Sequence, residues 1–176
     1  MKKVYLDIDD TLYDTYNYLR SLVVMSFGTD YIKDKNIYEM MAEDEEVKKL
    51  CMNVLSDYSK IPTKAYVNDF IRLLSGKYNV VLCSMYVFDC ERDAKEKLAN
   101  KLGVESILVK YDKNIGKSNI DMSDGIFVDD SIKLLNSSNA GRKILVGSKP
   151  KDNSWSGDCV EDCLELLVRL LWEEIE

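Results

Sequence analysis

The chain has 176 residues, of which 46% are hydrophobic and 31% are charged, and its formal net charge is -7. This length and composition predict one main globular domain with a core that needs no disulfide or structural metal, and they exclude a disordered chain. The acidic balance disfavours a nucleic acid polymer or an anionic membrane as partner, because both would repel the protein.

Two features of the composition narrow the chemistry further. The chain has no histidine, which excludes Ser-His-Asp triads, Cys-His dyads and HExxH zinc sites. Its five cysteines form no Cys-x-x-Cys pair, so we interpret them as thiols of a cytoplasmic, reducing environment. We expect no signal peptide and no membrane span. Acid–base catalysis must then come from Asp, Glu, Lys, Tyr or Cys.

Five short apolar runs predict the strands of a parallel sheet that is buried on both faces. They are rich in valine and isoleucine and do not alternate with polar residues. In chain order they cover residues 4–6, 80–83, 107–109, 126–128 and 144–146. Helical segments lie between most of them, which indicates a doubly wound, Rossmann-like α/β fold.

The segment from residue 13 to residue 60 interrupts this alternation. It contains one predicted helix that ends near Gly28 and another through residues 47–58, and the acidic run 43–46 suits the start of the second helix. We interpret the segment as a small helical cap inserted after the first strand. The predicted division is therefore a core of residues 1–12 and 61–176 and a cap of residues 13–60.

Three further helices are expected to cover the sheet. The first carries an apolar stripe between Pro62 and Gly76, and Asp89 is expected to cap the second. The last is expected to begin with Asp158 and Glu161 at capping-box spacing. Its predicted buried face consists of Val160, Cys163, Leu164, Leu167 and Leu171.

Polar side chains follow three of the predicted strands at the point where each strand ends. The first strand is followed by Asp7-Ile8-Asp9-Asp10-Thr11, the second by Ser84, and the fourth by Asp129-Asp130. Because ligands bind at the carboxyl ends of the strands of an open α/β sheet, we expect these groups to share one crevice. Several carboxylates in one crevice repel each other unless a cation is present, and Mg²⁺ prefers such oxygen ligands.

The same residue types suit phosphoryl transfer. A carboxylate can attack phosphorus to form an aspartyl phosphate. Asp7 and Asp9 share a face of the extended chain, so one can attack while the other moves protons. Ser84 can donate to a phosphoryl oxygen, and a lysine of the loop before the fourth strand can offset the charge. The candidate lysines are Lys110, Lys113 and Lys117.

These motifs resemble those of the haloacid dehalogenase superfamily of phosphatases. Residues 7–11 match its DxDxT motif, Ser84 its second motif, Lys117 or Lys113 its third, and Asp129-Asp130 its fourth, in the family's order. The resemblance covers the core from about residue 3 to residue 146.

The resemblance implies a role for each matched aspartate. Asp7 is the nucleophile, and Asp9 is the general acid and then the general base. Magnesium is held by Asp7, by the backbone carbonyl of Asp9 and by Asp129, with Asp130 as an auxiliary ligand.

A narrower resemblance concerns the substrate. The insertion after the first motif has the position of the family's C1 cap, and residues 116–130 are similar to the 5'(3')-deoxyribonucleotidase group. This implies a nucleoside or deoxynucleoside monophosphate as the small phosphorylated substrate. Candidate substrate-binding residues near the motifs are Thr11, Tyr13, Tyr16, Ser84, Met85 and Lys113. Tyr13 and Tyr16 are candidates for stacking on a base, whereas Thr11 is expected mainly to brace the loop.

Other functions remain open at this point. The substrate can be a different phosphorylated metabolite. Residues 7–12 also resemble the start of phosphoprotein phosphatases, although those enzymes lack a C1 cap. A phosphoacceptor signalling module places similar groups on a parallel sheet, but this chain has no suitable Asp after the strand where its acceptor would lie. A non-catalytic binding protein on the same fold is a further alternative.

Overall fold

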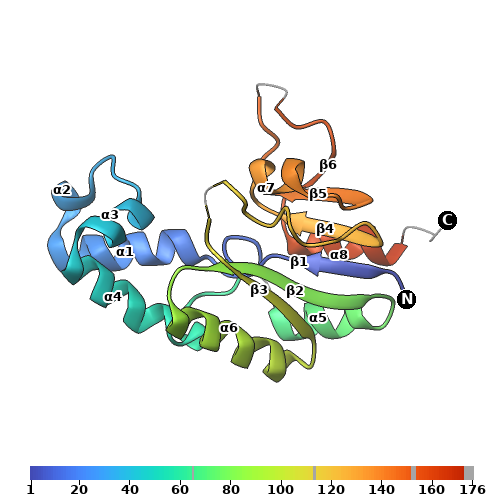
Figure 1. The fold of residues 1–176 in the computed structure, drawn as a ribbon, viewed down its shortest axis with the longest axis horizontal. Coiled ribbons are helices and arrows are strands. Elements are labelled where there is room, and N and C mark those ends of the chain that lie inside the picture. The colour runs from blue at the N-terminus through green and yellow to red at the C-terminus, as the bar shows by residue number, and fades with distance from the viewer. Residues whose placement is uncertain (65, 113, 152–153, 173–176) are drawn as a thin grey trace.

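A six-stranded parallel sheet forms the centre of the computed structural model, which describes residues 1–64, 66–112, 114–151 and 154–172. The strand order is β3-β2-β1-β4-β5-β6, and every neighbouring pair is parallel (Figure 1). The strands are β1 (Lys3–Leu6), β2 (Asn79–Tyr86), β3 (Glu105–Lys110), β4 (Gly125–Asp129), β5 (Arg142–Val146) and β6 (Asp158–Val160). The chain starts in the middle of the sheet, so the order reverses at β1, where open α/β sheets form their binding crevice.

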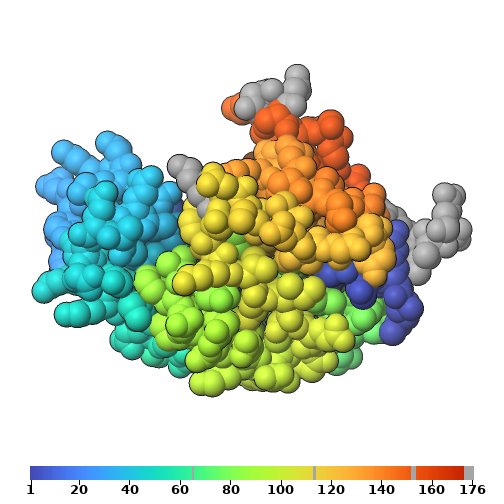
Figure 2. All heavy atoms as spheres, in the orientation of Figure 1, coloured from blue at the N-terminus to red at the C-terminus, as the bar shows by residue number. Residues whose placement is uncertain are grey.

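The side chains of β1 divide the core into two parts. Val4 and Leu6 point to the face that is covered by helices α5 (Val67–Ser75), α6 (Asp89–Leu102) and α8 (Cys163–Trp172). Tyr5 points to the opposite face, because neighbouring residues of a strand alternate. That face is covered by the short helix α7 (Ile132–Ser137) and by the irregular chain between β3 and β4, drawn in yellow in Figure 2. The predicted doubly wound α/β fold is confirmed.

Helices fill the chain between β1 and α5. They are α1 (Thr15–Phe27), α2 (Thr29–Ile32), α3 (Ile37–Glu43), α4 (Glu45–Leu55) and the 3-10 helix η1 (Tyr58–Lys60). Gly28 ends α1 as expected, and the acidic run begins α4, where the carboxylate of Asp44 accepts from the backbone of Glu46 and Val47. Two further short helices, α2 and α3, lie between them. Figure 1 shows α1–α4 beyond the carboxyl ends of the strands.

Two stretches of chain connect these helices to the sheet, and they lie side by side. The backbone amide of Asp14 donates to Pro62, and that of Lys64 donates to Leu12, both at 2.9 Å. The helical segment 13–60 thus begins and ends beside the loop after β1, and it also contacts the core where α4 and η1 pack against α6. None of the helices in the described part of the chain is long and apolar enough to cross a membrane.

The predicted start of the last helix is wrong. Asp158 does not cap a helix: it lies in β6, and its carboxylate pairs with Arg142 at 2.7 Å. Helix α8 begins at Cys163 and is capped by Asp162. This shift turns Leu164 outward, with 67% of its surface exposed, and the buried face consists of Cys163, Leu166 and Leu170. The exposed edge of β5 pairs with residues 158–160, and this long-range pairing outweighs the local capping pattern.

The predicted cap of α6 is also corrected. Asp89 lies inside the first turn, and the N-cap position is Phe88. The carboxylate of Glu91 reaches back instead and accepts from the backbone amides of the two residues before the helix, Val87 at 2.8 Å and Phe88 at 3.5 Å. Glu91 therefore stabilises the junction between β2 and α6.

Candidate active site

The loop after β1 is a compact turn that places the carboxylates of Asp7 and Asp9 at the carboxyl end of the sheet. Leu12 and Tyr13 both donate backbone hydrogen bonds to the carbonyl of Ile8. Asp10 takes a left-handed conformation with a φ of 57°, which aspartate tolerates better than most residues. Its side chain accepts from the amide of Tyr16 at 2.9 Å, which ties the turn to the start of α1.

Three carboxylates meet at the ends of the neighbouring strands β1 and β4. Asp7 and Asp129 are buried, Asp130 is exposed, and one oxygen of each lies within 4.8 Å of the others. The structure thus brings together three of the four residues predicted to hold a metal. Three hard oxygen donors on one crevice suit a small divalent cation such as Mg²⁺, and close carboxylates without one repel each other.

Lys117 is the lysine that reaches this cluster. Its ammonium lies 2.6 Å from Oδ1 of Asp7 and 2.7 Å from Oδ2 of Asp129, and only 1% of the residue is exposed. Burial opposes the charge, but the two carboxylates outweigh it and raise the pKa of Lys117 above its ordinary value. Lys110, by contrast, is exposed at the end of β3, and Lys113 lies outside the described residues.

Gly116 explains how Lys117 enters so deeply. Its φ is 53°, a conformation that side chains rarely adopt, and a Cβ here would lie 2.7 Å from the side chain of Leu134. Glycine therefore suits this turn against α7 better than a residue with a side chain. The next residue is thereby directed into the crevice.

The charges of the cluster are not balanced by this one lysine. Removal from water raises the pKa of Asp7 to about 7. The positive charge of Lys117 opposes this rise, whereas the negative charges of Asp129 and Asp9 add to it. Asp7 and Asp129 share this one ammonium, and Asp130 adds a third carboxylate beside them, so the crevice holds more acidic groups than basic ones. This is the electrostatic condition under which a bound cation is favourable.

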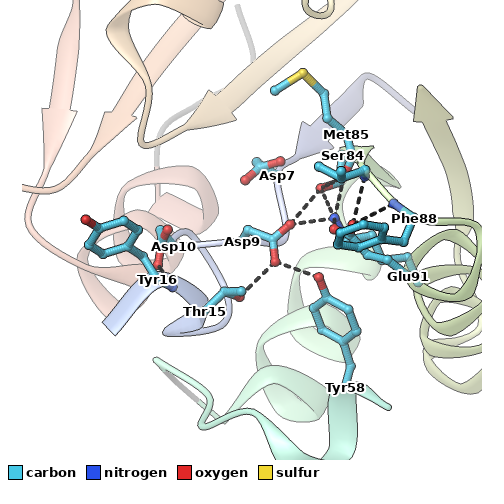
Figure 3. A network of polar contacts seen from close by, with 12 residues as sticks. Asp7, Asp9, Asp10, Thr15, Tyr16, Tyr58, Ser84, Met85, Phe88 and Glu91 are labelled. Carbon is cyan, nitrogen blue, oxygen red and sulfur yellow. Dashed lines mark hydrogen bonds and ion pairs between the residues drawn. The ribbon is translucent and has the colours of Figure 1, made fainter. Parts of the chain in front are cut away.

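Asp9 lies beside this cluster and receives four hydrogen bonds (Figure 3). Its Oδ1 accepts from Thr15 at 2.8 Å and from the hydroxyl of Tyr58 at 2.6 Å. Its Oδ2 accepts from Ser84 at 3.3 Å and from Lys95 at 2.5 Å. Burial raises the pKa of Asp9, but Lys95 and the hydroxyl donors outweigh burial and hold the pKa below its ordinary value.

Lys95 and Glu91 are site residues that the sequence reasoning missed. Both lie on α6 and are buried: 0% of Lys95 and 5% of Glu91 is exposed. A charged pair four residues apart on a helix usually lies on the solvent face. The sequence did offer one signal: residues 91, 94, 95 and 98 share one helix face, and the apolar Ala94 and Leu98 on that face are buried.

The candidate substrate-binding residues divide into buried and accessible ones. Thr11 is fully buried, and its hydroxyl has no hydrogen-bond partner among the described residues. Tyr13 is 6% exposed and packs edge-on against Tyr58 at 5.4 Å, so its ring faces have little room for a base. Packed in this way, Thr11 and Tyr13 have little surface with which to contact a substrate. Tyr16 is half-buried, and its ring lies 6.0 Å from that of Tyr38.

Met85 borders an open groove of about 200 Å³ beside the site. The groove is also lined by Gly116 and Ser131, which adjoin Lys117 and Asp130 in the chain, and by the side chains of Tyr111 and Leu134. Residues next to three of the four motifs therefore share one depression. Its position leaves room for part of a substrate at the edge of the crevice.

Comparison with known proteins gives the same class of fold. No family model and no curated protein matches the sequence. The structure, however, has the fold of haloacid dehalogenase-like hydrolases.

Three solved structures illustrate this likeness. One is a protein described as a β-phosphoglucomutase from Thermotoga maritima, with a TM-score of 0.64, 17% identity, and coverage of 97% of this chain and 99% of that one. Another is a haloacid dehalogenase-like hydrolase from Burkholderia xenovorans, with a TM-score of 0.59, 17% identity, and coverage of 98% and 99%. A third is described as the HAD hydrolase YfnB from Bacillus subtilis, bound to magnesium, with a TM-score of 0.62, 13% identity, and coverage of 96% and 98%. At these identities the likeness shows the fold alone.

Proposed function

We propose that this protein is a magnesium-dependent phosphomonoesterase that acts through an aspartyl phosphate on Asp7. One observation carries the proposal: Asp7 and Asp129 bind the buried ammonium of Lys117 and form a carboxylate cluster with Asp130 at the point where the strand order reverses. The arrangement combines a nucleophile, a cation site and a fixed positive charge, which are the parts that phosphoryl transfer needs.

The residues present fit a magnesium ion. Asp7, Asp129 and Asp130 would hold it, together with the backbone carbonyl of Asp9, and the solved structure of YfnB is described as bound to magnesium. When bound, the ion would neutralise charge on the phosphoryl oxygens. The ammonium of Lys117 forms ion pairs with two of these aspartates, Asp7 and Asp129. It would bring a second positive charge to the same phosphoryl group.

The side chains account for both halves of the reaction. A carboxylate oxygen of Asp7 attacks phosphorus, the bond to the leaving oxygen breaks, and Asp9 gives that oxygen its proton. Water then attacks the aspartyl phosphate, Asp9 takes a proton from the water, and the bond between phosphorus and Asp7 breaks to release phosphate. Ser84 is placed beside Asp9 to donate to a phosphoryl oxygen.

We propose that residues 13–60 act as a C1-type cap over a core of residues 1–12 and 61–176. We also propose that the substrate is a nucleoside or deoxynucleoside monophosphate. The half-buried Tyr16 pairs with Tyr38, and the two tyrosines supply aromatic surface near the crevice. Removal of its hydroxyl from water raises the pKa of Tyr38 well above its ordinary value, and so do the charges of Asp9 and Asp10, while 39% of the residue is exposed.

The first prediction concerns the metal. Hydrolysis of p-nitrophenyl phosphate should fall to background in EDTA, because the uncompensated carboxylates would repel the phosphate dianion. Addition of Mg²⁺ in excess of the chelator should restore the rate, which is followed by the release of p-nitrophenolate. Full activity in EDTA would contradict the metal assignment. A screen of phosphorylated metabolites under the restored conditions then tests the substrate class.

The second prediction concerns the choice of substrate. Tyr16→Ala should lower kcat/KM for the preferred nucleoside monophosphate by about tenfold, the effect of one lost stacking contact. Turnover of p-nitrophenyl phosphate should change much less, because its leaving group is small. Tyr66→Ala is the control, since Tyr66 is 88% exposed and lies outside the helical segment. Equal losses on both substrates would assign Tyr16 to the fold, and a wild-type preference for sugar phosphates would reject the nucleotide proposal alone.

A further inference from the structure

The most unusual buried group in the described part of the molecule is the ammonium of Lys95. It lies 2.5 Å from Oδ2 of Asp9, 2.7 Å from Glu91 and 3.2 Å from the hydroxyl of Ser84, and it also donates to the carbonyl of Met85. Every acceptor except Glu91 belongs to, or adjoins, a residue of the reaction proposed above. A buried lysine of this kind is rare, because an apolar side chain would fill the same space at a lower desolvation cost.

Glu91 holds this lysine in place. One oxygen of its carboxylate accepts from Lys95, and the other accepts from the backbone amides of Val87 at 2.8 Å and Phe88 at 3.5 Å. The carboxylate is thus anchored to the end of β2 and the start of α6. Through Lys95, this rigid junction is connected to the loop after β1, 86 residues away in the sequence.

The hydrogen bonds of Asp9 show what Lys95 contributes. Oδ1 is held by Thr15 and Tyr58, which belong to the helical segment 13–60. Oδ2 is held by Lys95 at 2.5 Å and by Ser84 at the longer distance of 3.3 Å. Without Lys95, the carboxylate of Asp9 would keep only the longer of these two contacts with side chains of the core, the one with Ser84.

We propose that Lys95, held by Glu91, is a positioning residue that fixes the carboxylate of Asp9 against Ser84 for proton transfer. This role rests on the proposed function, in which Asp9 gives a proton to the leaving oxygen. Lys95 itself need not touch the substrate. Its loss would also make Asp9 easier to protonate, because a neighbouring positive charge is removed. If orientation of the carboxylate matters more than this, removal of Lys95 should harm the reaction of leaving groups that require a proton and should spare those that depart as stable anions.

Two substrates of nearly the same size separate these cases. Phenyl phosphate releases a basic phenolate that benefits from protonation, whereas p-nitrophenyl phosphate releases a stable anion. We expect Lys95→Met to lower kcat for phenyl phosphate by about 10²-fold and kcat for p-nitrophenyl phosphate by less than about fivefold. KM should change by less than about twofold, because contacts to the phosphoryl group remain.

A double variant without the buried charges and a matched surface variant show whether any loss of activity comes from misfolding. Lys95→Met leaves Glu91 as an unpaired buried charge, so the double variant Glu91→Gln/Lys95→Met is measured beside it, and near-UV circular dichroism checks the fold of each. Both variants should show the same dependence on the leaving group. Lys101→Met removes an exposed lysine of the same helix and should leave both rates unchanged.

Combination with Asp9→Asn completes the test. If Lys95 acts through Asp9, then Asp9→Asn/Lys95→Met should be no slower on phenyl phosphate than Asp9→Asn alone. Equal losses on the two substrates, or a full additional loss in the Asp9→Asn background, would overturn the positioning role while the phosphatase proposal stands. If Asp9→Asn itself shows no dependence on the leaving group, the acid role of Asp9 is rejected, and the positioning role is rejected with it.

Discussion

Asp7→Asn should abolish phosphatase activity, with a loss of at least about 10⁴-fold in kcat. An amide cannot attack phosphorus to form the covalent intermediate, and no other carboxylate in the cluster occupies the end of β1. The fold should survive, because the amide oxygen of Asn can still accept the hydrogen bond that Lys117 donates at 2.6 Å. The measurement is steady-state turnover of p-nitrophenyl phosphate with Mg²⁺, with the melting temperature recorded in parallel.

Two controls make this result decisive. Asp69→Asn changes an exposed aspartate of α5, 66% exposed at its side chain, and should leave the rate unchanged. Mass spectrometry of the Asp7→Asn protein excludes deamidation back to aspartate. Near-normal rates in the intact variant would place the nucleophile elsewhere. A wild-type protein that becomes phosphorylated on Asp7 but does not release phosphate would instead favour the phosphoacceptor module.

Lys117→Met should have opposite effects on turnover and on metal binding. Turnover should fall by about 10²–10³-fold, because a fixed positive charge next to the phosphoryl group is lost. The affinity for Mg²⁺ should rise by about tenfold or more, because the ammonium now occupies oxygens of Asp7 and Asp129 that the ion would also use. Isothermal titration calorimetry measures the affinity, and turnover is measured at saturating Mg²⁺.

The same variant should be less stable without metal. Removal of Lys117 leaves Asp7 and Asp129 buried without their partner, which should lower the free energy of unfolding by about 3–5 kcal/mol. Saturating Mg²⁺ should recover part of this loss, because it binds the folded state. Lys110→Met is the exposed control, and Lys113→Met tests the second candidate of the sequence. Weaker Mg²⁺ binding in Lys117→Met, or a larger loss of activity in Lys113→Met, would contradict the assignment.

The sequence by itself determined the sheet and the positions of the acidic motifs. Four of the five predicted strands are short apolar runs that are buried in the sheet, so their identity depends on local composition. The predicted burial of the run 107–109 is wrong, because this run lies in the edge strand β3 and is only half-buried. Asp7, Ser84 and Asp129 come at the ends of such runs, and parallel strands place their carboxyl ends at one edge. The sixth strand escaped prediction because residues 158–160 contain a single strongly apolar residue and pair only once β5 is in place.

Only the tertiary structure decided which side chains surround those motifs. Three lysines precede β4, and the turn at Gly116 against Leu134 directs Lys117 into the crevice. Thr11 and Tyr13 lie in the loop after β1 but are packed into the core. Burial depends on what the remaining chain places over a residue, and local sequence does not contain that information.

The pair of Glu91 and Lys95 is the clearest case. Four residues apart on a helix, these side chains have the pattern of a solvated ion pair. Their partners, Asp9 and Ser84, come from two other strand ends, and they meet only when α6 packs against the sheet beside the helical segment. A charged group becomes part of a site when the fold removes its water and supplies new partners, and that exchange is a property of the assembled structure.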